Sequence, residues 1–489
     1  MMQKYILYLL LIIFFININA QQPEDIYNLI NEYKNSTTLQ NGQWSLYAEY
    51  TDSSQSIISL NSDEALAPAS CMKLVTTSAA LYYLKEDFRY ETKLFYNGNI
   101  SKNGTLNGNL YIVGSGDPTL GSSFVSGSLS LDELMKTWID AIAEKGIKTI
   151  HGAVIADDLL FEGITVPDNW YWVDIGNYYG AGTSALSINN NLYYLYFKPS
   201  KKVGGKAEVL RTEPEIPGLH FINYMKTGNY GSGDKGDIYS APGQFTATLR
   251  GTIPAGYKSF SIKGSIPDPP LFAAQYLTKK LEENKIHVSQ KATKIISPVK
   301  YDNSKKIIFT FSPKLKDIIY YINKRSDNFY TEQLLKTIAF YQTGTGSFDK
   351  GFDALKDFLL SNGIPASGVN FFDGSGLSRS DAISTQTIAK LLTFNTKQKY
   401  FDSFYNSLGV AGDKNDDGFF NNYGFDTPAA GNARLKDGYI GGVRSHSGYI
   451  KTKSGRLIAF SFIANNYNGS SKDINKIHLN LMIELANLP

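Results

Sequence analysis

Both ends of the chain carry periodic runs of apolar residues that differ from the pattern of its middle. Apolar residues recur at helical spacing in the outermost segments and alternate with polar residues in the segments just inside them. Because such helices and strands must bury their apolar faces against one another, we expect one α+β domain that is completed only when the chain returns. The predicted elements are a helix over 26–33, strands over 44–50 and 56–60, a hairpin of strands over 448–451 and 456–464, and a helix over 474–488.

The middle of the chain, from about residue 90 to 305, has a different pattern. Short alternating runs and Gly/Asn turns such as Asn97-Gly98 predict many short strands. One clear helix interrupts them, beginning at a capping box of Ser130 and Glu133 and ending at Gly146. We therefore expect a large β-rich insertion within the α+β domain, with a small α/β domain nested inside it. The predicted boundaries are 21–90 and 305–489 for the α+β domain, 91–120 and 196–304 for the insertion, and 121–195 for the nested domain.

The first 20 residues have the features of a targeting segment. Lys4 precedes an apolar run over 5–16, and Ile18-Asn19-Ala20 ends in a small residue suited to cleavage. A membrane-spanning anchor would need about 18 or more apolar residues in succession, which this run does not reach. We therefore predict a cleaved signal peptide over 1–20 and a periplasmic protein without an integral membrane anchor.

Composition argues against several classes of function. The formal net charge is +3 at pH 7 and no basic run of the kind that contacts phosphates occurs, which argues against nucleic acid as a partner. The five histidines are scattered without the spacing of metal ligands, so we expect neither a metal nor another cofactor. Cys71 is the single cysteine, which excludes an intramolecular disulfide, and we expect it to be a small packing residue.

The run from Ser70 to Lys73 carries the strongest chemical signal. A serine hydroxyl is a poor nucleophile until a neighbouring group takes its proton. Three residues are nearly one helical turn, so both side chains would project from one face, and the apolar residues that follow predict a buried helix. Burial disfavours the ammonium form, so Lys73 could act as a base near neutral pH. The spacing alone is weak evidence, because 232–235 and 347–350 share it.

A site of this kind needs a second hydroxyl and an amide, which move protons and hold the substrate backbone. Ser326 and Asn328, in the run Ser326-Asp327-Asn328, supply both groups. Taken alone this run is also weak evidence, because 59–61 and 187–189 share the pattern and such clusters often cap a helix. Its position far downstream of Ser70 makes it a candidate for the same site.

The third requirement is a cation on a strand edge that orients a substrate carboxylate. The literal Lys226-Thr227-Gly228 lies inside the expected insertion, so we interpret Lys226 as a turn residue. Lys436-Asp437-Gly438 follows Ser326 and precedes the terminal hairpin, where an edge strand could run beside the helix of Ser70. We therefore choose Lys436, although a solvated turn is the alternative interpretation of that run.

Taken in order, these runs resemble those of the type-4 penicillin-binding proteins, the periplasmic D-alanyl-D-alanine carboxypeptidases and endopeptidases that carry a large insertion. The resemblance extends over nearly all of the mature chain. It departs from the family at Asp437, where the family usually has a threonine or a serine. The further segments that resemble the family are Val113–Leu120, Tyr179–Ala181, Ser184–Ser187, Asp373–Arg379 and Phe460–Phe462.

The resemblance implies a penicillin-binding, serine β-lactamase-like transpeptidase fold and a catalytic set. Ser70 would attack the carbonyl between two D-alanine-type residues while Lys73 accepts its proton. Ser326 would relay that proton to the leaving amine, and Asn328 would hold Lys73 and the substrate amide. Lys436 would supply a positive field for the carboxylate of the substrate.

The resemblance also implies a set of substrate-binding residues. Backbone N–H groups of Ser70 and Tyr439 would form an oxyanion hole. Asp174 would receive a side-chain ammonium of the stem peptide, although it could equally cap a helix in an aromatic loop. Arg379 resembles an arginine near that pocket, although its run is also an ordinary turn. The remaining members of the set are Asp437, Gly438, Tyr179 and Leu377.

These inferences favour a serine DD-peptidase that trims or cuts peptidoglycan stem peptides and is acylated by β-lactams. Carboxypeptidase and endopeptidase activities both fit. A β-lactamase or esterase on the same scaffold is a second hypothesis, which differs in how long the acyl-enzyme survives. A non-catalytic peptidoglycan-binding protein is a third, because Asp437 would place an anion near the expected carboxylate position.

Overall fold

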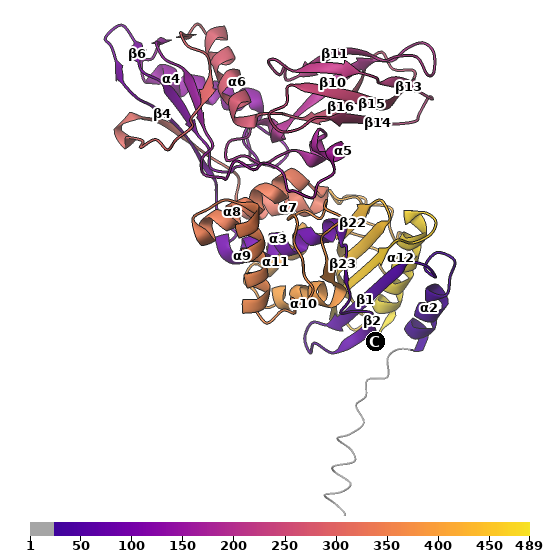
Figure 1. Cartoon of the computed structure of the whole chain (residues 1–489). Coiled ribbons are helices and arrows are strands. Elements are labelled where there is room, and N and C mark those ends of the chain that lie inside the picture. The colour runs from indigo at the N-terminus through magenta and orange to yellow at the C-terminus, as the bar shows by residue number, and fades with distance from the viewer. Residues whose placement is uncertain (1–23) are drawn as a thin grey trace, which may run out of the picture.

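The computed structural model describes residues 24–489, so the predicted signal peptide lies outside the described residues. The lower half of the molecule in Figure 1 is built around an antiparallel sheet in the strand order β2-β1-β24-β23-β22-β21. Strand β1 pairs with β24 from Gln43 opposite Asn465 to Tyr50 opposite Ile458, so the two ends of the chain complete one sheet. The strands are β1 (Gln43–Tyr50), β2 (Ser56–Leu60), β21 (Gly409–Val410), β22 (Arg434–Ile440), β23 (Val443–Lys451) and β24 (Leu457–Asn465).

Helices cover both faces of this sheet. Alternate residues of β24 show this, because Phe460 and Phe462 pack with the terminal helices, whereas Ala459 and Ile463 belong to a second core. Strand β24 is therefore buried along nearly its whole length instead of alternating between buried and exposed positions. The terminal helices are α2 (Glu24–Lys34) and α12 (Ser471–Asn487), and the second core holds α3 (Lys73–Leu84), α7 (Leu315–Arg325), α8 (Asn328–Thr343), α9 (Phe348–Ser361), α10 (Thr385–Asn395) and α11 (Phe401–Ser407).

Between α3 and α7 the chain forms the upper half of the molecule in Figure 1, with an apolar core of its own. A sheet in the order β18-β9-β7-β4-β19 packs against helices α4 (Leu131–Glu144) and α6 (Pro269–Glu283). The capping box predicted at Ser130 is present at the start of α4. The strands of this part are β4 (Glu91–Tyr96), β5 (Asn99–Ile100), β6 (Thr105–Asn107), β7 (Leu110–Val113), β8 (Thr149–Ile150), β9 (Val154–Asp157), β17 (His287–Val288), β18 (Thr293–Lys294) and β19 (Lys306–Phe311).

Two further sheets lie beside this part, at the upper right of Figure 1. Lys226–Gly228 forms strand β13 of one of them, so the interpretation of Lys226 as a turn residue is wrong. The physical reason is tertiary: Lys226 pairs with Thr252 of a neighbouring strand, and Thr227 is buried and accepts a hydrogen bond from the N–H of Ser200. The strands here are β10 (Leu192–Lys198), β11 (Glu208–Glu213), β12 (His220–Asn223), β13, β14 (Lys235–Tyr239), β15 (Thr246–Pro254) and β16 (Phe260–Ser265).

Helix α8 joins the lower and the upper halves. Asp327 caps its start by accepting a hydrogen bond from the N–H of Tyr330, and the following turns point buried polar side chains at the upper half. These side chains bond backbone and side-chain groups of residues 162–190, so α8 forms one polar link between the halves. The bonds join Tyr330 Oη to Asn190 Oδ1 (2.7 Å), Gln333 Nε2 to the carbonyl of Ser184 (2.9 Å) and Lys336 Nζ to the carbonyl of Glu162 (3.2 Å).

The helices and strands predicted at both ends of the chain are confirmed, and so is the α+β fold class. The domain boundaries within the upper half stay a prediction. Among residues 24–489, none of the helices combines the length and the apolar character that crossing a membrane requires. The remaining short elements are β3 (Ala65–Leu66), η1 (Ala69–Met72), α5 (Trp172–Ile175), η2 (Tyr178–Gly180), η3 (Asn189–Asn191), η4 (Asn303–Lys305) and β20 (Ile383–Ser384).

Candidate active site

Ser70 lies on the short 3-10 turn η1, which leads directly into helix α3. Ala69 before it has a φ of 45°, a left-handed conformation that is strained for a residue with a side chain. Two glycines fit against this turn: a Cβ on Gly376 would lie 1.8 Å from the carbonyl oxygen of Ala69, and one on Gly438 would lie 2.8 Å from the nitrogen of Ser70. Strand β22, which contains Gly438, therefore passes directly beside the backbone N–H of Ser70.

Lys73 is buried, and its ammonium group donates three hydrogen bonds. They go to Ser70 Oγ at 3.0 Å, to Asn328 Oδ1 at 2.6 Å and to the carbonyl oxygen of Ser375 at 2.8 Å. Burial, with a further contribution from the charge of Lys436, lowers the pKa of Lys73 to about 7. A substantial fraction of Lys73 is thus neutral at physiological pH and able to accept the proton of Ser70.

The predicted run Ser326-Asp327-Asn328, the second motif of the site, joins two helices beside Lys73. Ser326 ends α7 in a left-handed conformation, with a φ of 58°, and Asn328 is the first residue of α8. Asn328 uses both ends of its amide, since Oδ1 accepts from Lys73 and Nδ2 donates to the carbonyl of Tyr179 at 2.8 Å. The helix-capping role that such a cluster often has belongs to Asp327, which leaves the two neighbouring side chains free for the site.

A tight turn over residues 373–378 presents the carbonyl group of Ser375 to Lys73. The carboxylate of Asp373 shapes this turn by accepting the N–H groups of Ser375 at 3.0 Å and Ser378 at 2.6 Å. Glu332, one helical turn after Asn328, accepts the N–H of Gly374 with both carboxyl oxygens at 3.0 Å. Burial, together with the charge of Asp373, raises the pKa of Glu332 above its usual range.

Lys436 and Asp437 lie on strand β22 as predicted. Lys436 is buried, and its Nζ donates to the backbone carbonyl of Asp437 at 2.6 Å and to Asp437 Oδ1 at 3.2 Å. Asp437 Oδ2 accepts from Nη1 of Arg444 on β23 at 2.7 Å. Burial raises the pKa of Asp437, but the charges of Lys436 and Arg444 outweigh this effect and hold the pKa below its usual value. The alternative interpretation of the run as a solvated turn is therefore wrong.

A cavity of about 620 Å³ opens in front of Ser70. Its wall combines residues of α5, η2, the second motif, the 373–378 turn and the edge of β22, so segments from distant parts of the sequence meet there. Aromatic side chains of Tyr171, Tyr178 and Tyr439 remain more than two fifths exposed along the wall. The predicted site residues that line this cavity are Ser70, Ser326, Asn328, Asp174, Tyr179, Leu377, Arg379 and Tyr439.

Asp174 lies inside α5 and faces this cavity. The N-cap position of α5 is Tyr171, so the alternative role of Asp174 as a helix cap is not the one it has. Burial raises the pKa of Asp174, although a hydrogen bond from Tyr179 and the charge of Arg379 oppose this effect. The guanidinium of Arg379 donates to the carbonyl of Gly441 and lies over the ring of Tyr171, 5.7 Å from its centroid.

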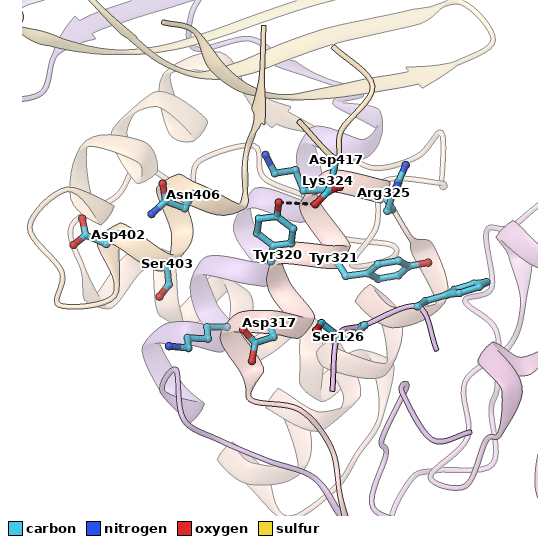
Figure 2. Close-up of a pocket in the computed structure, with 13 residues that line it drawn as sticks. Ser126, Asp317, Tyr320, Tyr321, Lys324, Arg325, Asp402, Ser403, Asn406 and Asp417 are labelled. Carbon is cyan, nitrogen blue, oxygen red and sulfur yellow. Dashed lines mark hydrogen bonds between the residues drawn. The ribbon is translucent and has the colours of Figure 1, made fainter. Parts of the chain in front are cut away.

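A second cavity, of about 460 Å³, lies between α7 and α11. Figure 2 shows Tyr320 and Tyr321 of α7 on one side of it and Ser403 and Asn406 of α11 on another. Tyr320 Oη donates to Asp417 Oδ2 at 2.8 Å across one end. The predicted catalytic serine and lysines are not among the residues that line this cavity, so we place the candidate active site in the first one.

Sequence reasoning missed the residues that support the site from behind. Glu332 and Asp373 fix the turn that bonds Lys73, and Arg444 bonds Asp437. Trp170 donates its indole N–H to Asp373 Oδ2 at 2.8 Å. The position of Glu332 places it one helical turn after Asn328, but nothing in the sequence indicates that it is buried. Within residues 24–489, no cluster of His, Cys, Asp and Glu side chains is arranged to hold a metal ion.

Comparison with known proteins gives a consistent result. Residues 27–485 match the D-Ala-D-Ala carboxypeptidase 3 (S13) family. A D-alanyl-D-alanine carboxypeptidase of Actinomadura sp. (strain R39) is 28% identical over 86% of this chain and 77% of its own length. The penicillin-sensitive carboxypeptidase A of Dictyostelium discoideum is 26% identical over 92% of this chain and 90% of its own length.

A solved structure has a similar fold. The crystal structure of penicillin binding protein 4 (dacB) from Haemophilus influenzae superimposes with a TM-score of 0.80 and 23% sequence identity. The alignment covers 94% of this chain and 99% of that protein. The arrangement of the sheet, the helices and the long segment between α3 and α7 is therefore one that a penicillin-binding protein also adopts.

Proposed function

The chain belongs to the D-Ala-D-Ala carboxypeptidase 3 (S13) family of serine peptidases, and from this premise we propose that it cleaves peptidoglycan stem peptides through an acyl-enzyme on Ser70. The observation that carries the proposal is the set of three hydrogen bonds made by Lys73, which join it to Ser70, Asn328 and the 373–378 turn. Among the described residues, no other Ser-x-x-Lys run has a buried lysine and a serine that lines a cavity.

In the proposed mechanism, neutral Lys73 takes the proton of Ser70 Oγ as the oxygen attacks the carbonyl carbon of the penultimate D-alanine. The N–H groups of Ser70 and Tyr439 stabilise the negative charge on the carbonyl oxygen, and the position of Gly438 beside Ser70 supports this role. The C–N bond then breaks, and the leaving amine receives a proton through Ser326. Water then attacks the acyl carbon while Lys73 accepts its proton. The bond between the acyl carbon and Ser70 Oγ breaks, and Ser70 Oγ takes the proton back from Lys73.

The remaining predicted residues have proposed roles in binding. Asn328 holds the substrate amide as well as Lys73, and Lys436 supplies positive charge toward the terminal carboxylate. Asp174 receives an ammonium group at the end of the long diamino-acid side chain, since its carboxylate lies among aromatic rings that suit such a chain. The other proposed binding residues are Gly438, Tyr439, Tyr179, Leu377 and Arg379. Asp437, which was also expected to bind the substrate, bonds Lys436 and Arg444 instead.

The proposal includes carboxypeptidase action on D-Ala-D-Ala ends, endopeptidase action on cross-links to diaminopimelate, and acylation by β-lactams. The word penicillin-sensitive in the name of the Dictyostelium discoideum relative supports the last of these. We propose export to the periplasm by the N-terminal segment, as the sequence predicts.

Covalent labelling tests the proposal. A fluorescent penicillin should attach to the mature protein, and Ser70→Ala should abolish the label while the far-UV circular dichroism stays unchanged. Ser232→Ala, in a Ser-x-x-Lys run of the upper half, is the matched control and should label normally. Label that survives in Ser70→Ala would refute the assignment of the nucleophile.

Digestion of purified muropeptides then separates the functional alternatives. Loss of terminal D-alanine, or separation of cross-linked dimers, should be visible by mass spectrometry. A protein that labels, leaves muropeptides intact and rapidly hydrolyses the penicillin would be a β-lactamase. A protein that neither labels nor cleaves but sediments with peptidoglycan would be a non-catalytic binding protein.

A further inference from the structure

One anion on strand β22 is shared between two cations. Asp437 Oδ2 accepts from Arg444 at 2.7 Å, and Oδ1 accepts from Lys436 at 3.2 Å. The side chains of Lys436 and Arg444 are only 1% and 11% exposed, and that of Asp437 is 20% exposed. Water therefore screens these interactions poorly. How strongly Asp437 interacts with each of the two cations thus changes the positive charge that Lys436 presents to the cavity.

The strand register places these groups on two faces of the sheet. Gly438, the neighbour of Asp437, faces the turn of Ser70. Asp437 lies opposite His446 in the register, and His446 bonds His478 of α12 on the other side of the sheet. Because neighbouring residues of a strand point to opposite faces, Asp437 belongs to the α12 face.

Helix α12 fixes the position of Arg444. Nε of Arg444 donates to Asn475 Oδ1 at 2.5 Å, and Nη1 is left to bond Asp437. The planar guanidinium thus bonds two partners at once, Asn475 on helix α12 and Asp437 on strand β22. It holds the carboxylate of Asp437 toward the α12 face and away from the turn of Ser70.

The charges explain how the site tolerates an aspartate directly after Lys436. Lys436, Asp437 and Arg444 together carry a net charge of +1, the same as a lysine followed by an uncharged hydroxyl residue. Without Arg444, the nearest cation to Asp437 would be Lys436, and that pair would have no net charge. A carboxylate arriving from the cavity would then meet a neutral pair.

We propose that Arg444 is a positioning residue of the carboxylate subsite, which holds Asp437 on the α12 side of β22 and so keeps the charge of Lys436 available to a substrate or penicillin carboxylate. This inference rests on the proposed function and deepens it. Arg444 and Asp437 therefore form a functional pair. Loss of Arg444 alone is harmful, because Asp437 then neutralises Lys436, whereas loss of Asp437 alone is not.

The test is a double-mutant cycle with two peptides. The enzymes are the wild type, Arg444→Gln, Asp437→Thr and the double variant, each assayed on an acyl-D-Ala-D-Ala peptide and on the same peptide with an amidated C-terminus. Arg444→Gln should lower kcat/KM on the free carboxylate about tenfold or more, chiefly through KM, since one unit charge is lost near the subsite. The amidated peptide should lose much less. Adding Asp437→Thr should restore most of the loss.

The controls separate this role from general damage. Arg456→Gln breaks an exposed Arg–Asp ion pair between turns that flank the same sheet, formed with Asp52 at 2.8 Å, and should leave the cleavage of both peptides unaffected. Arg444→Lys keeps the charge but cannot bond Asn475 and Asp437 at once, so its loss on the free carboxylate should be smaller than that of Arg444→Gln. Equal losses on both peptides, or a double variant no better than Arg444→Gln, would overturn the inference. A wild type that cleaves neither peptide would instead refute the proposed function.

Discussion

The indole N–H of Trp170 donates to the carboxylate of Asp373 at 2.8 Å, although 203 positions separate the two residues in sequence. Trp170 immediately precedes Tyr171, which lines the cavity, and Asp373 shapes the turn whose carbonyl group bonds Lys73. This bond therefore ties the cavity wall that we propose contacts the substrate side chain to the turn that bonds Lys73, the proposed base.

Trp170→Phe should weaken both functions of this link. The variant removes the N–H donor from a buried carboxylate, which should lower the free energy of unfolding by about 1–3 kcal/mol. KM for stem peptides should rise more than the acylation rate of a small penicillin falls, because the loop over 169–174 loosens first. Urea denaturation and steady-state kinetics provide the measurements. Trp172→Phe, at a position that is 62% exposed, is the control and should be nearly neutral.

Acylation should follow the protonation of Lys73. Because its pKa is lowered to about 7, the neutral form grows as the pH rises through 7, and the acylation rate should rise with it. Lys73→Ala should reduce acylation by about 10²–10⁴-fold, the usual effect of losing a general base. Stopped-flow labelling between pH 5 and 9 measures both effects. Lys226→Ala, in the literal Lys-Thr-Gly run, should leave the rate and its pH dependence unchanged, and equal losses in the two variants would contradict the assignment.

Glu332 should act as an uncharged hydrogen-bond acceptor at neutral pH, because burial raises its pKa. Glu332→Gln preserves an oxygen for the N–H of Gly374 and should retain most of the stability and activity. Glu332→Ala leaves that N–H without a partner and opens a cavity, so the free energy of unfolding should fall by about 2–4 kcal/mol. Thermal unfolding and penicillin acylation compare the two. A glutamine variant as damaged as the alanine variant would mean that the charge itself is required.

Asp174 should matter only for substrates with a distal ammonium. Asp174→Asn keeps the size of the side chain and removes its charge, which should raise KM about tenfold or more for peptides that carry a free diaminopimelate amine. Small acyl-D-Ala-D-Ala mimics without that amine should change far less. Competition between the two substrates in one reaction gives the ratio directly, and equal losses on both would assign Asp174 to structure alone.

Asp437→Thr should raise penicillin acylation, since it leaves Lys436 and Arg444 as two cations without a counter-charge. One unit charge at about 4 Å is worth about 1 kcal/mol even in bulk water, and more where water screens it poorly, so the gain should be about fivefold or more. The pKa of Asp437 is held below its usual value, so the aspartate stays ionised throughout the neutral and mildly acidic range. The gain should therefore be constant from pH 8 to pH 5 and diminish only below about pH 4. A threonine variant no faster than the parent would show that Asp437 does not influence the ligand.

Local sequence patterns were sufficient to predict the helices and strands at the ends of the chain and the contact between Ser70 and Lys73. Periodicity predicts α12 and the hairpin of β23 and β24, and helical spacing predicts that Ser70 and Lys73 meet. These inferences depend on residues close in sequence, where geometry is nearly fixed. The Lys226 run shows the limit of the same approach, because a three-residue match has no information about the sheet that buries Thr227.

The supporting contacts could not be predicted in this way for three physical reasons. The partner of Lys73 at Ser375 is a backbone carbonyl, which every residue type possesses. Glu332 is ionisable, and an acidic residue on a helix is usually solvated, so its complete burial is a product of tertiary packing. The bond between Arg444 and Asp437 depends on the exact register of a hairpin, which a sequence pattern specifies only to within a residue or two.

Helix α8 begins with Asn328 in the candidate active site, and its following turns carry the side chains that bond the upper half of the molecule. Asn328 itself donates from Nδ2 to the carbonyl of Tyr179, a residue of the upper half, at 2.8 Å. The upper half is therefore no detachable module: removing it would strip partners from the buried Gln333 and Lys336 and disturb Asn328 at the same time. We expect the two halves to melt in a single calorimetric transition, and loss of penicillin labelling to coincide with it.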